Sequence, residues 1–183
     1  MSLTPSYMVP LGIEMPSFLL PDVVSGSDIN SGSFDEKPVL VMFICAHCPY
    51  VIHIEPQLAS LSSDYKGRVN IVAISSNDVV SHPQDSPEKL KAQSEKNNFN
   101  FPYCFDEDQS VAKAFNAQCT PDFFLFDNQK KLVYRGQLDK SRPGNNFPLD
   151  GKDLRNAIDS LLDNNEISKN QLPSTGCNIK WKQ

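Results

Sequence analysis

The sequence of 183 residues lacks any apolar run that approaches the about 18 residues of a membrane-spanning helix. Its first residues lack a basic stretch followed by an apolar segment of about 7–15 residues, so no signal peptide is expected. Basic residues are also scarce: 17 Lys and Arg stand against 22 Asp and Glu, which gives a formal net charge of −5. Clustered Lys and Arg are what a phosphate backbone binds. We therefore expect neither a membrane nor a nucleic acid among the partners.

Several catalytic motifs are missing as well. The sequence contains no glycine-rich phosphate loop, no clear Ser-His-Asp arrangement, no internal repeat and no low-complexity tract. We expect no cofactor and no resident metal. Its five cysteines, an odd number at uneven spacing, do not fit the disulfide framework of a secreted protein. A reducing compartment, the cytoplasm, with one reactive cysteine pair fits better.

The chain does contain one strongly patterned stretch. Residues 39–44 form an apolar run rich in β-branched and aromatic side chains, which predicts a strand buried on both faces. Cys45 and Cys48 follow at once. Over residues 50–64 apolar side chains then recur at intervals of three and four, which predicts a helix. The cysteine pair is therefore expected where a central strand turns into a helix.

This position has a chemical meaning, because a helix N-terminus stabilises a thiolate over a thiol. We expect Cys45 to have a lowered pKa and to be the attacking nucleophile. Cys48, one turn further on, would resolve the mixed disulfide. His47 would add a donor or a positive charge beside Cys45 and make the disulfide more oxidising. A Cys-x-x-Cys pair is also half of a zinc site, so a thiolate metal site that includes His47 or Cys119 is the alternative.

The remaining pattern predicts one domain over residues 1–183. It has an N-terminal arm and hairpin (1–33, with 1–16 irregular), a core (34–165) and a C-terminal tail (166–183). Further strands are expected at 17–21, 69–75, 101–105, 122–127 and 131–136, and further helices at 86–97, 110–116 and 151–162. The strand, helix and strand over 39–75 imply a right-handed parallel crossover.

Three segments are candidates to reach the cysteine edge. The loop 76–87 follows a parallel strand and contains His82, and the loop 139–150 contains Arg142. Either loop could instead be an ordinary solvated connection. The tail spans up to ~50 Å between Asp163 and Cys177, so Cys177 could return as a resolving or regulatory thiol. The alternative is a tail that only packs Trp181 on the body.

The sequence Cys119-Thr120-Pro121 precedes an apolar strand, so the Thr120–Pro121 bond is a candidate for the cis isomer. With the strand, Cys45-x-x-Cys48 and the helix, this segment resembles the thioredoxin fold over roughly residues 34–165. The N-terminal hairpin and the insert 77–101 resemble the alkyl hydroperoxide reductase and thiol-specific antioxidant branch. Cys-Thr-Pro-Asp-Phe-Phe and the ending Gly-Cys-Asn-Ile-Lys-Trp-Lys are similar to peroxiredoxin-like thioredoxin family proteins.

The resemblance implies an α/β thioredoxin-like fold, with a central mixed sheet flanked by helices, an N-terminal β-hairpin extension and an extended C-terminal tail. It implies that Pro121 is cis and faces the cysteine pair, and that Thr120 offers its backbone to an extended peptide substrate. A dithiol–disulfide cycle through Cys45 and Cys48 is the expected activity. Its partners would be a protein or small-molecule thiol or disulfide and a thiol reductant.

Peroxidase activity is the second expectation. The peroxiredoxin motif Pro-x-x-x-Thr/Ser-x-x-Cys is absent, and matching its cysteine to Cys48 puts Cys45 at the Thr/Ser position. The arginine expected before the strand that begins near Phe123 is missing as well. A thiolate metal-binding protein is the third possibility.

Overall fold

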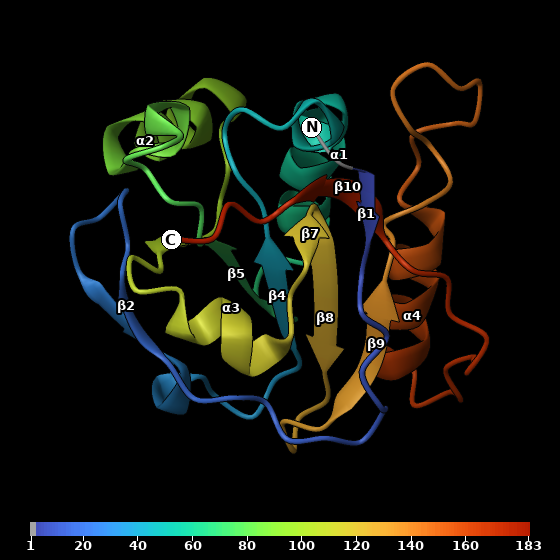
Figure 1. The fold of residues 1–183 in the computed structure, drawn as a ribbon. Coiled ribbons are helices and arrows are strands. Elements are labelled where there is room, and N and C mark those ends of the chain that lie inside the picture. The colour runs from blue at the N-terminus through green and yellow to red at the C-terminus, as the bar shows by residue number, and fades with distance from the viewer. Residues whose placement is uncertain (1–2) are drawn as a thin grey trace.

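The computed structural model describes residues 3–183 and contains a central five-stranded mixed sheet (Figure 1). Its strand order is β6-β5-β4-β8-β9. The strands are β4 (Val39–Phe43), β5 (Asn70–Ser75), β6 (Tyr103–Phe105), β8 (Asp122–Phe126) and β9 (Leu132–Gly136). β4 pairs with β5 in parallel and with β8 in antiparallel orientation, so the crossover and the later hairpin are both confirmed.

Helices cover both faces of this sheet. The helices are α1 (Pro49–Asp64), α2 (Pro87–Asn97), α3 (Ser110–Phe115) and α4 (Lys152–Leu162). Leu40, Met42 and Ile44 pack in one core cluster with α1, α2 and α4. The alternate residues Val39, Val41 and Phe43 pack in a second cluster with α3, which lies in front of the sheet in Figure 1. This two-sided burial is the reason for the continuous apolar run, since side chains of a strand alternate between its faces.

A second, three-stranded sheet lies across the end of the central one (Figure 1). Its order is β1 (Leu3–Pro5), β10 (Thr175–Asn178) and β7 (Cys119–Thr120), all antiparallel. The prediction that residues 1–16 are irregular is therefore wrong for residues 3–5, and the first two residues lie outside the described part. Pairing between the two ends of the chain leaves no local pattern, so three-residue β1 escaped sequence reasoning.

The shorter elements complete the body. β2 (Leu19–Pro21) and β3 (Asp28–Asn30) form the expected N-terminal hairpin. The 3₁₀ turns are η1 (Ser31–Ser33) and η2 (Pro83–Asp85). Over residues 3–183, no helix is long and apolar enough to cross a membrane.

Candidate active site

The cysteine pair lies where the sequence placed it, between β4 and α1. Cys48 is the N-cap residue of α1, and Pro49 occupies the first helical position. Proline suits this position because its missing N–H would have no partner in the first turn. Both cysteines are fully buried. Cys45 precedes the helix, so Cys48 is the sulfur closest to the helix N-terminus.

Thr120 contacts both sulfurs. The Thr120–Pro121 peptide bond is cis, as the resemblance implied. Sγ of Cys45 lies 3.4 Å from Oγ1 of Thr120, and Sγ of Cys48 lies 3.3 Å from the Thr120 carbonyl oxygen. Segments 72 or more residues apart in the sequence thus meet at one point.

The structure reverses the expected acidity of the two thiols. Burial, together with a hydrogen bond to Cys48, holds the pKa of Cys45 well above its usual value. The pKa of Cys48 is lowered to about 5, first by the hydrogen bond from Cys45 and then, against the cost of burial, by Cys177 and by the Val51 amide of the first helical turn. These directions run opposite to the expectation for Cys45, and because the two sulfurs share a hydrogen bond they describe the pair rather than either thiol alone. The helix favours the thiolate at its own N-cap, and that residue is Cys48.

His47 is held by a residue that sequence reasoning missed. The carboxylate of Asp85 is fully buried and accepts hydrogen bonds from the backbone amides of Ala46 (2.8 Å) and His47 (3.0 Å). Its second oxygen binds Nδ1 of His47 at 2.5 Å and accepts from the Asn77 side chain at 2.7 Å. Asp85 raises the pKa of His47 through this hydrogen bond. One buried carboxylate therefore positions both residues between the cysteines.

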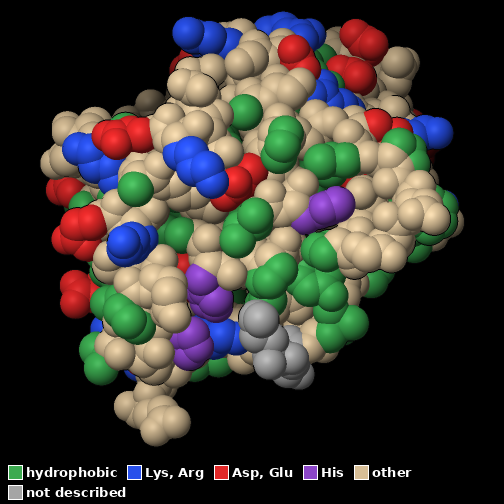
Figure 2. All heavy atoms as spheres, turned by 90° about the horizontal axis from the view of Figure 1, so that it is seen from above, with side chains coloured by type: hydrophobic (Ala, Val, Ile, Leu, Met, Phe, Trp, Pro, Cys, Tyr) green, Lys and Arg blue, Asp and Glu red, His purple; other side chains and the backbone are tan. Residues whose placement is uncertain are grey.

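The loop 76–87 does reach the cysteine edge. The ring of His82 stacks on that of His47, with centroids 5.4 Å apart and an interplanar angle of 28°. Burial, then the neighbouring His47, lowers the pKa of His82. Figure 2 looks down on the molecule from above and shows histidine side chains at the surface with apolar side chains beside them. His82 thus borders the site through His47 rather than through a sulfur.

Arg142 approaches Pro121 from the other side. The two residues line one small cavity together with Tyr50 and Ser174. The guanidinium donates to the carbonyl oxygens of Asp139 and Ser141 and to the side chain of Gln137. Arg142 therefore braces its own loop beside the cis bond.

A buried polar network contacts the backbone of Cys45. The side-chain amide of Gln93 donates to the Cys45 carbonyl oxygen at 3.3 Å and to the Glu55 carboxylate at 2.8 Å. The Tyr103 hydroxyl donates to the carbonyl oxygen of the Gln93 side chain at 3.1 Å. These groups come from α1, α2 and β6. They hold the backbone of Cys45 in place, and no local spacing in the sequence announces them.

The three remaining cysteines differ in their surroundings. Cys177 brings its Sγ to 2.9 Å from Sγ of Cys48. Cys119 is buried with its Sγ 3.7 Å from the Pro121 carbonyl oxygen, and burial raises its pKa strongly. Burial raises the pKa of Cys104 to about 12. Cys104 packs in the second core cluster, which contains α3 and is called the α3 cluster below, as expected for a small apolar side chain.

The backbone of Thr120 already has a partner. β10 pairs with β7 in antiparallel register, with Cys177 opposite Thr120. The expectation that Thr120 offers its backbone to an extended substrate peptide is therefore wrong for this structure, because the C-terminal strand occupies that edge. Trp181 also packs on the body, so the tail brings Cys177 back to the cysteine edge and packs its tryptophan as well.

Cys45, His47 and Asp85 are the candidate ligands for a metal ion. One ligand atom from each lies within 4.8 Å of the others. Thiolate and imidazole suit zinc, which takes four ligands in a closed site. Both Asp85 oxygens and Nδ1 of His47 are, however, already engaged with one another and with neighbouring amides. Cys119, the other ligand considered, is directed at Pro121, so these residues do not form a prepared metal site.

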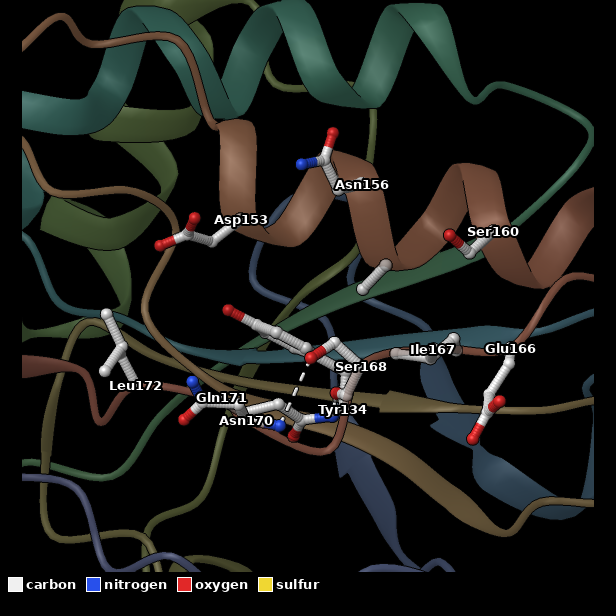
Figure 3. Close-up of a pocket in the computed structure, with 11 residues that line it drawn as sticks. Tyr134, Asp153, Asn156, Ser160, Glu166, Ile167, Ser168, Asn170, Gln171 and Leu172 are labelled. Carbon is white, nitrogen blue, oxygen red and sulfur yellow. Dashed lines mark hydrogen bonds between the residues drawn. The ribbon is translucent and has the colours of Figure 1, made fainter.

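A larger cavity lies away from the sulfurs (Figure 3). It has a volume of about 270 Å³ and lies between α4 and the segment 166–172. Its walls include Tyr134, Asp153 and Gln171. None of the described residues that line it is a cysteine.

Comparison with known proteins identifies the family to which the chain belongs. The model of the AhpC/TSA family matches residues 11–135. The chain belongs to the AhpC/TSA family. It is 46% identical to an uncharacterised conserved protein from Geobacillus kaustophilus of known crystal structure, with a TM-score of 0.97, over 100% of this chain and 97% of that one.

Two further proteins are similar to this AhpC/TSA family member. The thiol-disulfide oxidoreductase YkuV of Bacillus subtilis is 26% identical over 99 residues, which cover 53% of this chain and 64% of that relative's length. A secreted Mycobacterium tuberculosis disulfide oxidoreductase homologous to E. coli DsbE is 17% identical, with a TM-score of 0.63 over 79% of this chain and 96% of that one. At that identity the likeness shows a common fold. The expected thioredoxin-like fold, a central mixed sheet flanked by helices, is confirmed.

Proposed function

We propose that this protein is a thiol-disulfide oxidoreductase that cycles Cys45 and Cys48 between dithiol and disulfide. The observation that carries the proposal is the hydrogen-bonded pair of sulfurs at the start of α1, with Thr120 of the cis Thr120–Pro121 bond against them. The names of YkuV and of the Mycobacterium tuberculosis relative support the reaction class. The partners would be a thiol or disulfide substrate and a thiol reductant.

The acidity of the two thiols sets their order in the cycle. Cys48 is the thiolate near neutral pH, so it attacks one sulfur of the substrate disulfide and the other substrate sulfur leaves as a thiolate. Cys45 keeps its proton until the mixed disulfide has formed. It then attacks Sγ of Cys48 and releases the second substrate thiol. Two electrons pass to the substrate, and the protein ends as the Cys45–Cys48 disulfide.

Single substitutions test this order. Cys48→Ser should abolish reduction of a small disulfide such as oxidised glutathione, measured with a thiol reductant in excess. Cys45→Ser should form a mixed disulfide on Cys48 that mass spectrometry detects as an adduct of one glutathione. Cys104→Ser is the control, because this thiol lies in the α3 cluster, and it should turn over normally. Full turnover by Cys45→Ser would contradict the proposal.

Thiol peroxidase activity is the second candidate, and the lowered pKa of Cys48 favours it. Family membership supports it as well. In that reaction the Cys48 thiolate takes one oxygen atom from a peroxide and becomes a sulfenic acid, which a second thiol converts to a disulfide and water. Stoichiometric hydrogen peroxide should then consume Cys48 far faster than free cysteine. Consumption at the rate of free cysteine would exclude a peroxidase.

A further inference from the structure

The C-terminal strand brings a third sulfur to the cysteine pair. β10 is the central strand of the small sheet, with β1 on one side and β7 on the other. Cys177 stands opposite Thr120 in this sheet, and its side chain is 3% exposed. Its Sγ lies 2.9 Å from Sγ of Cys48, a residue 129 positions earlier in the chain. In Figure 1, β10 (red) crosses the end of the central sheet above β7.

Gly176 explains how the strand comes so close. A Cβ atom at this position would stand 2.0 Å from the Thr120 carbonyl oxygen and 2.8 Å from its carbonyl carbon. Any other residue would therefore push β10 away from β7. The glycine allows the backbone of β10 to lie directly against Thr120. This contact sets how close Sγ of Cys177 comes to Sγ of Cys48.

Cys48 consequently stands between two possible partners. Hydrogen bonds from Cys45 and from Cys177 both reach its sulfur. A thiol that touches the sulfur of a disulfide is placed to attack it, since exchange proceeds by attack of a thiolate on one of the two sulfurs. The arrangement brings Sγ of Cys177 to Sγ of Cys48. This sulfur would be shared by a Cys45–Cys48 disulfide and a Cys48–Cys177 disulfide.

We propose that Cys177 is a third member of the redox cycle, which moves the disulfide from Cys45–Cys48 to Cys48–Cys177. This inference rests on the proposed function, which supplies the Cys45–Cys48 disulfide. The Cys177 sulfur forms a bond to Sγ of Cys48, the bond between Cys45 and Cys48 breaks, and Cys45 leaves with the electron pair. The proton that Cys177 loses passes to Cys45, so the exchange needs no outside oxidant or reductant.

The exchange has two consequences for the site. It regenerates the Cys45 thiol while the protein stays oxidised. It also ties β10 covalently to the N-terminus of α1, so the strand that covers Thr120 is held in place. A reductant must then break Cys48–Cys177 before an extended chain can pair with Thr120. Burial raises the pKa of Cys177 to about 12, and burial likewise raises that of Cys45, so each of these thiols carries a proton when it is not in a disulfide.

Tryptic mapping of the oxidised full-length protein separates the two disulfides. Trypsin leaves Cys45 and Cys48 together in residues 1–66, because Lys37 precedes a proline, and releases Cys177 in residues 170–180. The Cys45–Cys48 bond therefore stays within one peptide, whereas Cys48–Cys177 links two. The reduced protein is treated with one equivalent of diamide, sampled over time, and its remaining thiols are blocked with N-ethylmaleimide.

In the wild type, the internal disulfide of residues 1–66 should fall as the link to residues 170–180 rises. Cys45→Ser should give only the linked species, and Cys177→Ser only the internal one. Gly176→Ala, which keeps all thiols, should slow appearance of the link by tenfold or more. Cys119→Ser is the matched control, because it removes a buried thiol of β7 directed at Pro121, and it should give the wild-type pattern.

The outcomes distinguish this inference from the proposed function. Absence of the linked species in both the wild type and Cys45→Ser, with normal turnover, would overturn the role of Cys177 and leave the Cys45–Cys48 cycle intact. A linked species that forms as fast in Gly176→Ala as in the wild type would also overturn it. Absence of turnover in the wild type and in every variant that keeps Cys45 and Cys48 would count against the proposed function instead. Far-UV circular dichroism confirms that each variant is folded.

Discussion

Asp85 offers the sharpest test of the site, through the substitution Asp85→Asn. The asparagine keeps an oxygen that can accept from the backbone amides of Ala46 and His47. Its new amide group faces Nδ1 of His47, which is a donor when the ring is protonated, and the side-chain amide of Asn77, which is also a donor. Those two hydrogen bonds are lost, while the shape of the residue is unchanged.

The magnitude follows from the two lost bonds. A hydrogen bond to a charged group contributes about 1.5–3 kcal/mol to stability. We use the lower end, because solvent reaches part of the His47 ring, and expect Asp85→Asn to lower the free energy of unfolding by about 3 kcal/mol near pH 5.5. The pKa of His47 should fall at the same time, because the neighbouring carboxylate that raises it is gone.

The effect depends on pH in a direction that the pKa shifts define. The pKa of His47 is raised, so its stabilising contribution is complete below 6.5, its ordinary value, and is lost as the pH rises through the raised pKa. The pKa of Asp85 is lowered, because hydrogen bonds from His47 and Asn77 outweigh the effect of burial. Its contribution is complete above 3.8 and is lost as the pH falls through the lowered pKa. The destabilisation by Asp85→Asn should therefore be greatest between pH 3.8 and 6.5.

Urea unfolding of the reduced protein at pH 5.5 and 8.5, followed by circular dichroism, measures the effect. The proton resonances of His47 report its pKa. Glu88→Gln is the control. It neutralises an exposed carboxylate that follows Asp85 by three residues in the sequence. Equal stability of Asp85→Asn and the wild type at pH 5.5 would refute the argument, as would a destabilisation that is the same at both pH values.

Two further predictions concern the thiols and the tail. Absorbance at 240 nm should show one thiol that ionises with a midpoint near 5, and Cys48→Ser should remove this step; a first ionisation near 9 in the wild type would contradict the assignment of the thiolate. Gly136→Ala places a Cβ 2.1 Å from the Leu172 carbonyl oxygen at a φ of +136°. It should cost about 2 kcal/mol, or ~4–8 °C in Tm. Gly67→Ala, also at positive φ but with open space around it, should cost less, and equal losses of Tm would show that the contact with Leu172 has no effect.

The main elements of the fold were predictable because their signals are local. The run 39–44 alternates its side chains between two buried faces, and the spacing in α1 follows the helical period. The strand–cysteine–helix order and Thr120–Pro121 before β8 were sufficient to place the cysteine pair at the start of a helix and to indicate a cis bond. Such patterns lie within about ten residues of chain and need no knowledge of distant partners.

The parts that sequence reasoning missed depend on contacts between distant segments. Asp85 is one acidic residue in a polar loop, and only the packing of that loop turns its carboxylate toward Ala46 and His47. The three-residue strand β1 forms because β10 offers it an edge.

The sequence by itself determined that two thiols stand at the start of a helix, because strand and helix periodicities place them there. Which thiol ionises was decided only by tertiary structure. The pKa of Cys48 depends on hydrogen bonds from Cys45 and Cys177. Burial raises the pKa of both of these donors. The place of Cys177 was decided in the same way, since Gly176 must meet Thr120 across the chain before the third sulfur can reach Cys48.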